Sequence, residues 1–201
     1  MVTTTGIEQL ELRANDLALD FANTLEGPRN GPAHTDHLGG YAEVVAWAAH
    51  AGALDATTAR ALARRAARRP ADAARALAAA QSLRDAIART FTALADERPP
   101  APDALAALRD GAADAVRASR PAPGALAWDG RDLERPLWPI AVAGLDLLRD
   151  AERLARLKRC AHCCWLFLDS SRNRSRRWCS MGECGAQDKM RRYRARRRAA
   201  R

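Results

Sequence analysis

Apolar residues recur at intervals of three and four along most of the first 160 positions, the spacing that places side chains on one face of an α-helix. The clearest stripe runs through residues 71–95 and consists of Leu77, Ala80, Leu83, Ile87, Phe91 and Leu94. It predicts a long amphipathic helix. Similar spacing predicts further helices over 41–51, 56–69, 103–118 and 133–157.

Glycine, proline and capping residues mark where several of these helices begin and end. Gly52 suits a left-handed C-cap after 41–51, and Asp55 is an N-cap for the helix that follows. Pro70 interrupts the pattern, and the long helix ends before a cluster of Pro99, Pro100 and Pro102. The chain therefore belongs to the mainly α class.

Three segments depart from the helical spacing. Residues 10–13 and 17–21 alternate apolar and polar positions around Asn15-Asp16, which predicts a hairpin. Residues 124–128 predict a short strand, and Gly27–Gly40, rich in Gly, Pro and His, predicts a loop. We therefore expect a helical N-terminal domain that contains a small β element.

All five cysteines lie between Cys160 and Cys184. Cys160 and Cys163 form a C-x2-C pair. After fifteen intervening residues, Cys179 and Cys184 form a C-x4-C pair, close to the spacing of a structural zinc site. Two short loops can each present two thiolates to one tetrahedral Zn²⁺, and four sulfur ligands leave no place for a catalytic water. The spacing predicts a structural zinc centre.

Other assignments of the thiols remain open from the spacing. Cys164 could replace Cys163, and His162 could replace a sulfur, although its position inside a tight knuckle points it away from the ion. A redox C-x-x-C pair is a rival interpretation, but no βαβ pattern surrounds it and it would leave the second pair unexplained. The favoured ligands are Cys160, Cys163, Cys179 and Cys184.

The composition indicates a protein that folds without disulfides. The chain has 201 residues, 48% of them hydrophobic, enough for a substantial core. The N-terminal sequence lacks the pattern of a signal peptide, and no window approaches the length of an apolar membrane span. We therefore expect a cytoplasmic protein with no membrane association, in a compartment where clustered cysteines more often bind metal than form disulfides.

The net charge of +9 is concentrated at one end of the chain. Residues 153–201 hold 16 Lys and Arg against 3 Asp and Glu, a net charge of +13, whereas residues 1–152 have a net charge of −4. This division predicts two domains, a helical body (1–152) and a basic finger segment (153–201). The finger segment is expected to bind a polyanion, with DNA favoured over RNA.

The candidate nucleic-acid contacts lie between the cysteine pairs and after the last cysteine. They are Arg172, Arg174, Arg176, Arg177, Lys189, Arg191, Arg192, Arg194 and Arg198. A helix after Cys184 would lie along or within a DNA groove and contact phosphates, or form a solvated basic tail. The neighbouring aromatic residues, Trp165, Phe167 and Trp178, could stack on bases but are more readily explained as a cover for the metal.

Residues 163–185 hold two distinctive stretches. They are Cys163-Cys-Trp165-Leu-Phe-Leu-Asp169-Ser-Ser171-Arg-Asn173 and Arg176-Arg-Trp178-Cys-Ser-Met181, followed by Cys184-Gly185. This region resembles the CGNR-type zinc finger of bacterial regulators. The resemblance implies a treble-clef-like or knuckle-type finger followed by a basic helix, and it supports Cys163 as the second ligand. The Asn-Arg of the family pattern is replaced here by Ala186-Gln187, while Lys189 remains.

The body resembles the ABATE domain that accompanies this finger. The similar residues are Leu17-Ala-Leu-Asp20-Phe-Ala-Asn23-Thr24, the 41–52 segment with Trp47, and Leu137-Trp138-Pro-Ile-Ala. The family is described as stress-induced transcription regulators. Together with the charge separation and the four-thiolate spacing, the resemblance favours a DNA-binding transcription regulator, associated with the nucleoid, whose body senses an effector or forms a homodimer.

One polar cluster in the body, Asp20, Asn23 and Thr24, is a candidate effector site. A carboxylate, an amide and a hydroxyl beside Leu19 and Phe21 could bind a small molecule. They could equally satisfy backbone groups where a strand turns into a helix, which is the favoured interpretation.

Two other functions remain as alternatives. The same finger could serve an RNA-binding or ribosome-associated protein, and the body could contain an enzyme site. Against an enzyme, the four histidines (His34, His37, His50 and His162) are scattered, and no nucleophile–base motif or phosphate-binding glycine loop appears. We expect a protein that is not an enzyme.

Overall fold

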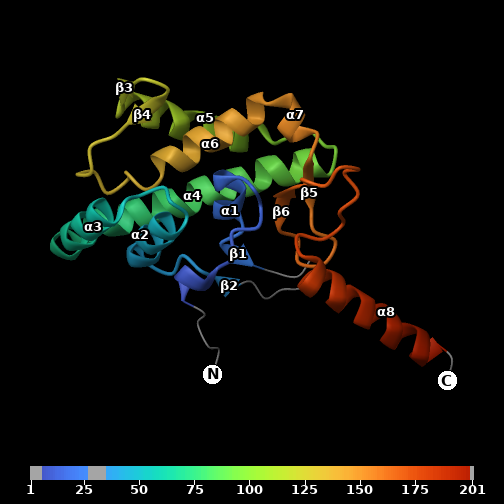
Figure 1. Cartoon of the computed structure of the whole chain (residues 1–201). Helices are drawn as coiled ribbons and strands as arrows, with labels where there is room; N and C mark the ends of the chain where they lie inside the picture. Colours follow the sequence, from blue (N-terminus) through green and yellow to red (C-terminus); the bar gives the residue numbers. More distant parts are fainter. Residues whose placement is uncertain (1–5, 27–34, 200–201) are drawn as a thin grey trace.

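A computed structural model describes residues 6–26 and 35–199 (Figure 1). Its helices are α1 (Leu17–Ala22), α2 (Tyr41–His50), α3 (Ala56–Arg68), α4 (Pro70–Ala95), α5 (Pro102–Arg117), α6 (Trp138–Arg149), α7 (Ala151–Leu154) and α8 (Ala186–Ala199), with a 3₁₀ turn η1 (Ile7–Gln9) and a π-helical turn η2 (Met181–Gly185). Three antiparallel strand pairs join β1 (Leu25–Glu26) to β2 (Thr35–Asp36), β3 (Arg120–Ala122) to β4 (Ala125–Ala127), and β5 (Leu157–Arg159) to β6 (Leu166–Leu168). The predicted mainly α class is confirmed.

The long helix α4 is the centre of the molecule. Its 26 residues bury a face that includes Leu83, Ile87 and Phe91. Helices α1, α2 and α5 pack against it, and the β5–β6 hairpin contacts it near its C-terminal end (Figure 1). Pro70 occupies its first turn, where the missing N–H costs nothing because that group has no partner within a helix. The apolar stripe read from the sequence is thus the face that assembles the core.

Several predicted element boundaries are confirmed. Helix α2 is followed by Gly52 at φ +73°, the left-handed conformation expected of a C-cap glycine. The Asp55 carboxylate accepts hydrogen bonds from the N–H groups of Thr57 and Thr58, both at 2.9 Å, and so starts α3. The strand predicted near 124–128 is β4.

The predicted hairpin over residues 10–21 is wrong, because residues 17–22 form helix α1. The Asp16 carboxylate accepts hydrogen bonds from the N–H groups of Ala18 (2.9 Å) and Leu19 (3.1 Å), which starts a helix. Asn15, at φ +59°, makes the preceding turn. Ala18–Ala22 are all buried, so the apparent alternation did not mark an exposed face.

The predicted helix over 133–157 is too long at both ends. Helix α6 begins at Trp138 and ends at Arg149. The side chain of the next residue, Asp150, accepts a hydrogen bond from Arg153 N–H at 3.0 Å and starts the separate short helix α7. Leu157 is already part of β5, paired with Leu168. The leucines do recur at helical spacing, but the Asp150 cap interrupts the helix and strand pairing draws Leu157 into β5. In the predicted loop Gly27–Gly40, Thr35–Asp36 form β2, and residues 27–34 lie outside the described part of the chain.

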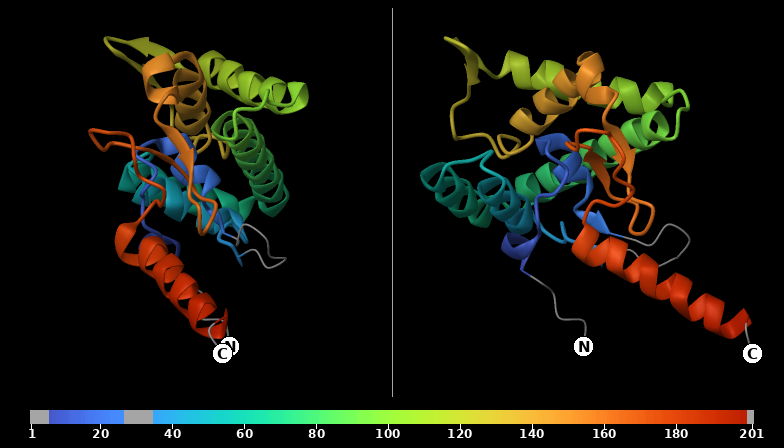
Figure 2. Two further views of the ribbon diagram at one scale, coloured as in Figure 1. Left: turned by 90° about the vertical axis from the view of Figure 1, so that its right-hand side faces the viewer. Right: turned by 45° about the vertical axis from the view of Figure 1, so that its right-hand side comes forward.

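The finger segment and the helical body share one hydrophobic core. Leu166, Phe167 and Leu168 of β6 are buried, and the same apolar cluster continues from Leu10 to Cys184. Helix α8 leaves this core and projects away from the rest of the molecule in all three views (Figures 1 and 2). Among the described helices, none combines the length and apolar character needed to cross a bilayer.

Candidate metal centre and nucleic-acid surface

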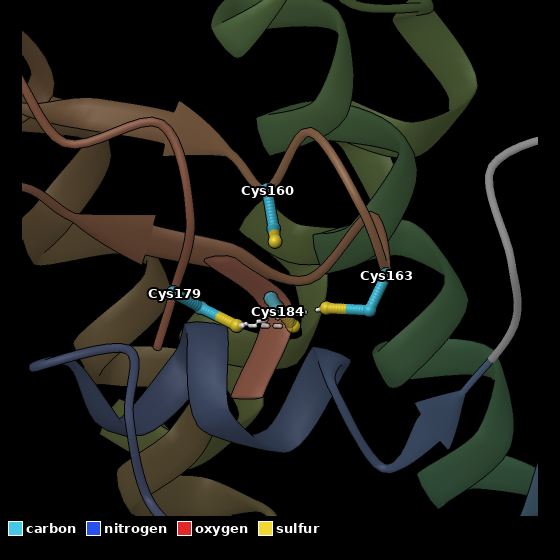
Figure 3. Close-up of side chains that lie close together, drawn as sticks. All are labelled: Cys160, Cys163, Cys179 and Cys184. Carbon is cyan, nitrogen blue, oxygen red and sulfur yellow. Dashed lines mark hydrogen bonds between the residues drawn. The ribbon is translucent and has the colours of Figure 1, made fainter. Parts of the chain in front are cut away.

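Four cysteine sulfurs converge beside the β5–β6 hairpin (Figure 3). Cys160 follows β5, Cys163 lies in the next turn, Cys179 precedes η2 and Cys184 lies within it. Their sulfurs all lie within 4.8 Å of one another, with Cys163 Sγ 3.6 Å and Cys184 Sγ 3.7 Å from Cys179 Sγ. A tetrahedral Zn²⁺ with Zn–S distances of about 2.3 Å requires sulfurs about 3.8 Å apart. The cluster fits zinc, and these sulfurs form no disulfide.

The thiols strongly perturb one another's protonation. The pKa of Cys160 is lowered, because the Cys163 and Cys179 thiols donate hydrogen bonds to it. The hydrogen bond between Cys160 and Cys163 raises the pKa of Cys163 far above its ordinary value. The hydrogen bond between Cys160 and Cys179 raises the pKa of Cys179 to about 12. These four thiols, three buried and one half-buried, thus cannot all ionise unaided, and a divalent cation supplies the charge that stabilises them as thiolates.

Backbone hydrogen bonds fix the two loops that carry the sulfurs. Cys160 N–H donates to Trp165 O at 2.8 Å, and Cys164 N–H donates to Cys160 O at 3.2 Å, closing a tight turn around Cys163. In the second loop, Ser180 Oγ accepts from Glu183 N–H at 3.3 Å and starts η2. Cys164, at φ +70°, is not one of the four clustered cysteines.

A buried carboxylate, Asp169, organises the basic loop (residues 170–178) between the two cysteine pairs. It accepts hydrogen bonds from Ser171 N–H (2.9 Å), Arg176 N–H (2.8 Å) and Lys158 Nζ (2.9 Å), and none of its surface is exposed. Burial raises its pKa, but the hydrogen bonds from Ser171 and Lys158 lower it more, so the pKa lies well below its usual value. Asp169 belongs to the pattern that resembles the CGNR-type finger, but no role was assigned to it from the sequence, although Asp-x-Ser is a local turn signal.

The predicted nucleic-acid residues of the basic loop fall into two groups. Arg172, Arg174 and Arg177 are exposed, and the guanidinium of Arg177 lies 5.2 Å from the centre of the Trp178 ring. Arg176 is half-buried, donates to Cys179 O at 2.5 Å and lies 5.1 Å from the Phe167 ring centre. Its guanidinium therefore supports the fold of the finger.

Helix α8 carries the remaining predicted contacts on several faces, all of them exposed. Arg191, Arg194 and Arg198 line a hollow of about 990 Å³ together with His162 and Gln187. Asp188, at the start of the helix, pairs with Arg191 (2.5 Å) and Arg192 (2.9 Å). The negative charge of an acidic residue in the first turn is stabilised by the positive end of the helix dipole. Here Asp188 also holds two arginines beside the finger.

The candidate effector residues lie at α1, where backbone groups occupy most of their polar atoms. Asn23 Nδ2 donates to Leu166 O and its Oδ1 accepts from Leu166 N–H, both at 2.9 Å. Thr24 Oγ1 donates to Phe21 O at 2.7 Å. Asp20 accepts from Ala14 N–H at 2.8 Å and borders a cavity of about 520 Å³, and burial raises its pKa to about 6.

The histidines are dispersed in the structure as well. His37 Nε2 lies 3.2 Å from Glu26 Oε2, His50 Nε2 lies 2.8 Å from Leu10 O, and His162 Nε2 lies 2.7 Å from Gln187 Oε1. His34 lies outside the described residues. Within residues 6–26 and 35–199, the four-cysteine group is the one cluster of His, Cys, Asp and Glu that could hold a metal.

Ion pairs between distant parts of the sequence join the finger segment to the body. Arg13 pairs in a bidentate manner with Glu183, at 2.6 and 2.5 Å. Arg153 donates to Asp16, the residue that caps α1, at 2.6 Å. Pairs separated by well over a hundred positions leave no local signal, so sequence reasoning did not find them.

A helical body joined to a four-cysteine centre and a basic helix defines a zinc-finger protein. Two family models match the chain: ABATE, described as "Putative stress-induced transcription regulator", over residues 15–151, and the CGNR zinc finger over residues 156–197. The chain therefore belongs to the ABATE family and carries a CGNR zinc finger. These are a regulator family and a zinc finger, not enzyme families. Searches of the curated proteins and of the solved structures found no match.

Proposed function

We propose that this protein is a DNA-binding transcription regulator in which a four-cysteine zinc finger presents the basic helix α8 to DNA. The main support for this proposal is that a four-sulfur cluster lies at the base of an exposed helix with seven Lys and Arg residues. The ligands are Cys160, Cys163, Cys179 and Cys184, and zinc is structural because four sulfurs complete its coordination.

The distribution of charge supports a polyanionic partner. The finger segment has a net charge of +13 and the body −4, so the molecule is strongly polarised. Such a field attracts a polyanion to one end and repels it from the other. The exposed arginines of the basic loop and the cations of α8 supply phosphate contacts, which position a protein on a duplex without reading its sequence.

In this proposal the body regulates the finger. The two parts meet through α1 and the β5–β6 hairpin, so an effector or a second copy of the chain bound to the body would act on the finger through these contacts. The protein would then work in the cytoplasm, on the nucleoid.

The test is a titration of duplex DNA of mixed sequence with the full-length, zinc-loaded protein at increasing salt, followed by fluorescence anisotropy. Each phosphate contact contributes about 0.9 unit to the slope of log K against log salt. With four or more contacts we expect a slope of about −4 or steeper. An affinity that does not change with salt would contradict the proposal, and preferential competition by structured RNA would support an RNA-binding protein instead.

A matched pair of variants tests whether DNA binding depends on the arginines of α8 or only on the net positive charge of the protein. Replacing Arg194 and Arg198 with Ala should make the slope shallower by about 2 units if both contact phosphates. Replacing Arg65 and Arg68 of α3 with Ala removes the same charge from the body and should leave the slope unchanged.

A further inference from the structure

One face of α8 differs in chemistry from the others. Gln187, Arg191, Arg194 and Arg198 follow one another at intervals of four, three and four residues and line the hollow described above. This spacing places all four on a single side of the helix, here called the groove face. Gln187 is the one uncharged member, and it occupies the first turn, next to the zinc-binding knuckle.

His162 holds the carboxamide of Gln187 in place. Its Nε2 lies 2.7 Å from Gln187 Oε1, so a proton on that nitrogen donates to the amide oxygen. An amide oxygen accepts two hydrogen bonds and the NH₂ group donates two. One acceptor position and both donors of Gln187 therefore remain available, and the side chain is exposed.

The shape of α8 fits the major groove of duplex DNA. A helix with its side chains is about 10–12 Å across, and the major groove of B-DNA is about 12 Å wide. Helix α8 projects away from the body (Figure 2), and its described side chains from Met190 to Arg198 are exposed, so this part of the helix is accessible to a groove. The major groove of A-form RNA is too deep and narrow for the same approach.

Within the major groove, glutamine and arginine recognise different bases. Glutamine pairs in a bidentate manner with adenine, accepting from N6 and donating to N7, whereas arginine pairs with guanine O6 and N7. From the groove face we infer that Gln187 is a specificity-determining residue that reads an adenine in the major groove of duplex DNA, with its carboxamide oriented by His162. This inference rests on the proposed DNA-binding function and adds the base that is read and the residue that reads it.

The experiment is a selection of binding sites from a pool of randomised DNA duplexes, with full-length, zinc-loaded wild-type protein and the variants Gln187→Ala and Gln187→Arg. The wild type should enrich an A·T pair at one position. Gln187→Ala should lose preference at that position alone, and Gln187→Arg should change it to G·C. Anisotropy with the selected duplex and its A·T to G·C derivative should show a preference of about tenfold, reversed in Gln187→Arg.

Two further variants separate base reading from charge and from folding. Arg196 lies on the opposite side of α8 from the groove face. Arg196→Ala should therefore lower affinity for all sequences without changing the selected base. His162→Phe removes the donor to Gln187 and should weaken the adenine preference while retaining one zinc per chain, whereas His162→Asn, which keeps a donor, should preserve more of that preference.

The outcomes separate this inference from the function on which it rests. If the wild type fails to bind DNA, both the proposed function and the inference are wrong. If the wild type binds with a steep salt dependence but all Gln187 variants select the same sites, or no sequence is enriched, the function stands and the inference is overturned.

Discussion

Asp20 and Asp169 are both buried, yet their surroundings shift their pKa values in opposite directions. Asp20 accepts hydrogen bonds from the backbone N–H groups of Ala14 and Arg13, which lower its pKa, but burial outweighs them and raises the pKa to about 6. Asp169 is bonded by Lys158 and Ser171, which lower its pKa. Asp169 therefore stabilises the fold above the pKa of an unfolded aspartate and loses this contribution as the pH falls through acidic values.

Asp20 has the reverse pH dependence. Its folded pKa of about 6 lies above the unfolded value of 3.8, so its favourable contribution is present below pH 3.8 and is lost as the pH rises through 6. Asp20→Asn keeps an oxygen to accept from Ala14 N–H but cannot ionise. Its stability relative to wild type should increase between pH 4 and pH 7 by up to about 3 kcal/mol. Urea unfolding at a series of pH values measures this, and a difference that is constant with pH would contradict it.

At the scale of elements, α8 depends on what lies before it. Isolated helices of its 14-residue length are marginal in water, and α8 buries little of its surface. The turn η2 supplies Cys184 and leads directly into α8, while Asp188 neutralises part of the charge at its start. We therefore expect a bound zinc ion to fix the direction in which the basic helix leaves the core.

Removal of zinc should therefore disorder the finger. Structural zinc contributes on the order of 10 kcal/mol in small metal-dependent modules. A chelator should release one zinc per chain, reduce the far-UV helical signal and abolish the DNA binding proposed above, and added zinc should restore all three. Cys179→Ser should show the same loss without restoration.

Met181→Ala is the matched control for this experiment, because Met181 lies in η2 but is 62% exposed. It should retain stoichiometric zinc. A chelated protein with unchanged helicity and affinity would show that the sulfurs do not organise α8.

At the scale of the whole molecule, a single core joins two parts that differ in sequence character. Asn23, the C-cap residue of α1, pairs with both backbone groups of Leu166 in β6, as a neighbouring strand would. Leu168 N–H donates to Ala14 O at 2.9 Å, and Arg13 pairs with Glu183. We therefore expect the zinc-loaded chain to unfold in one cooperative transition in calorimetry. Two separate transitions would show that the segments 1–152 and 153–201 are energetically independent.

Asn23→Ala tests the contact between Asn23 and Leu166. It leaves the buried N–H and C=O of Leu166 without partners, at a cost of about 1–3 kcal/mol for each group. The free energy of unfolding should fall by about 2–4 kcal/mol. Asn173→Ala, at an exposed position in the basic loop, should change it by less than about 0.5 kcal/mol. Equal effects of the two variants in urea unfolding would contradict the role assigned to Asn23.

Local signals predicted most of the helices. Gly52 and Asp55 acted as caps, and the stripe from Leu77 to Leu94 marked the buried face of α4. The failures occurred where a side chain changed the backbone against the pattern, as Asp16 and Asp150 did by starting helices. The clustering of four sulfurs followed the predicted spacing because ligands of one ion must meet, while Arg176 proved to be engaged within the finger.

The sequence by itself determined the helical class, the positions of the thiols and the separation of charge, because these depend on residue type and spacing along the chain. Only the tertiary structure decided that β6 completes the core of the body and that His162 meets Gln187 at the base of α8. The reason is physical. The partner of Asn23 lies 143 residues away and consists of backbone atoms that every residue carries, so no pattern of side chains in the sequence can predict this contact.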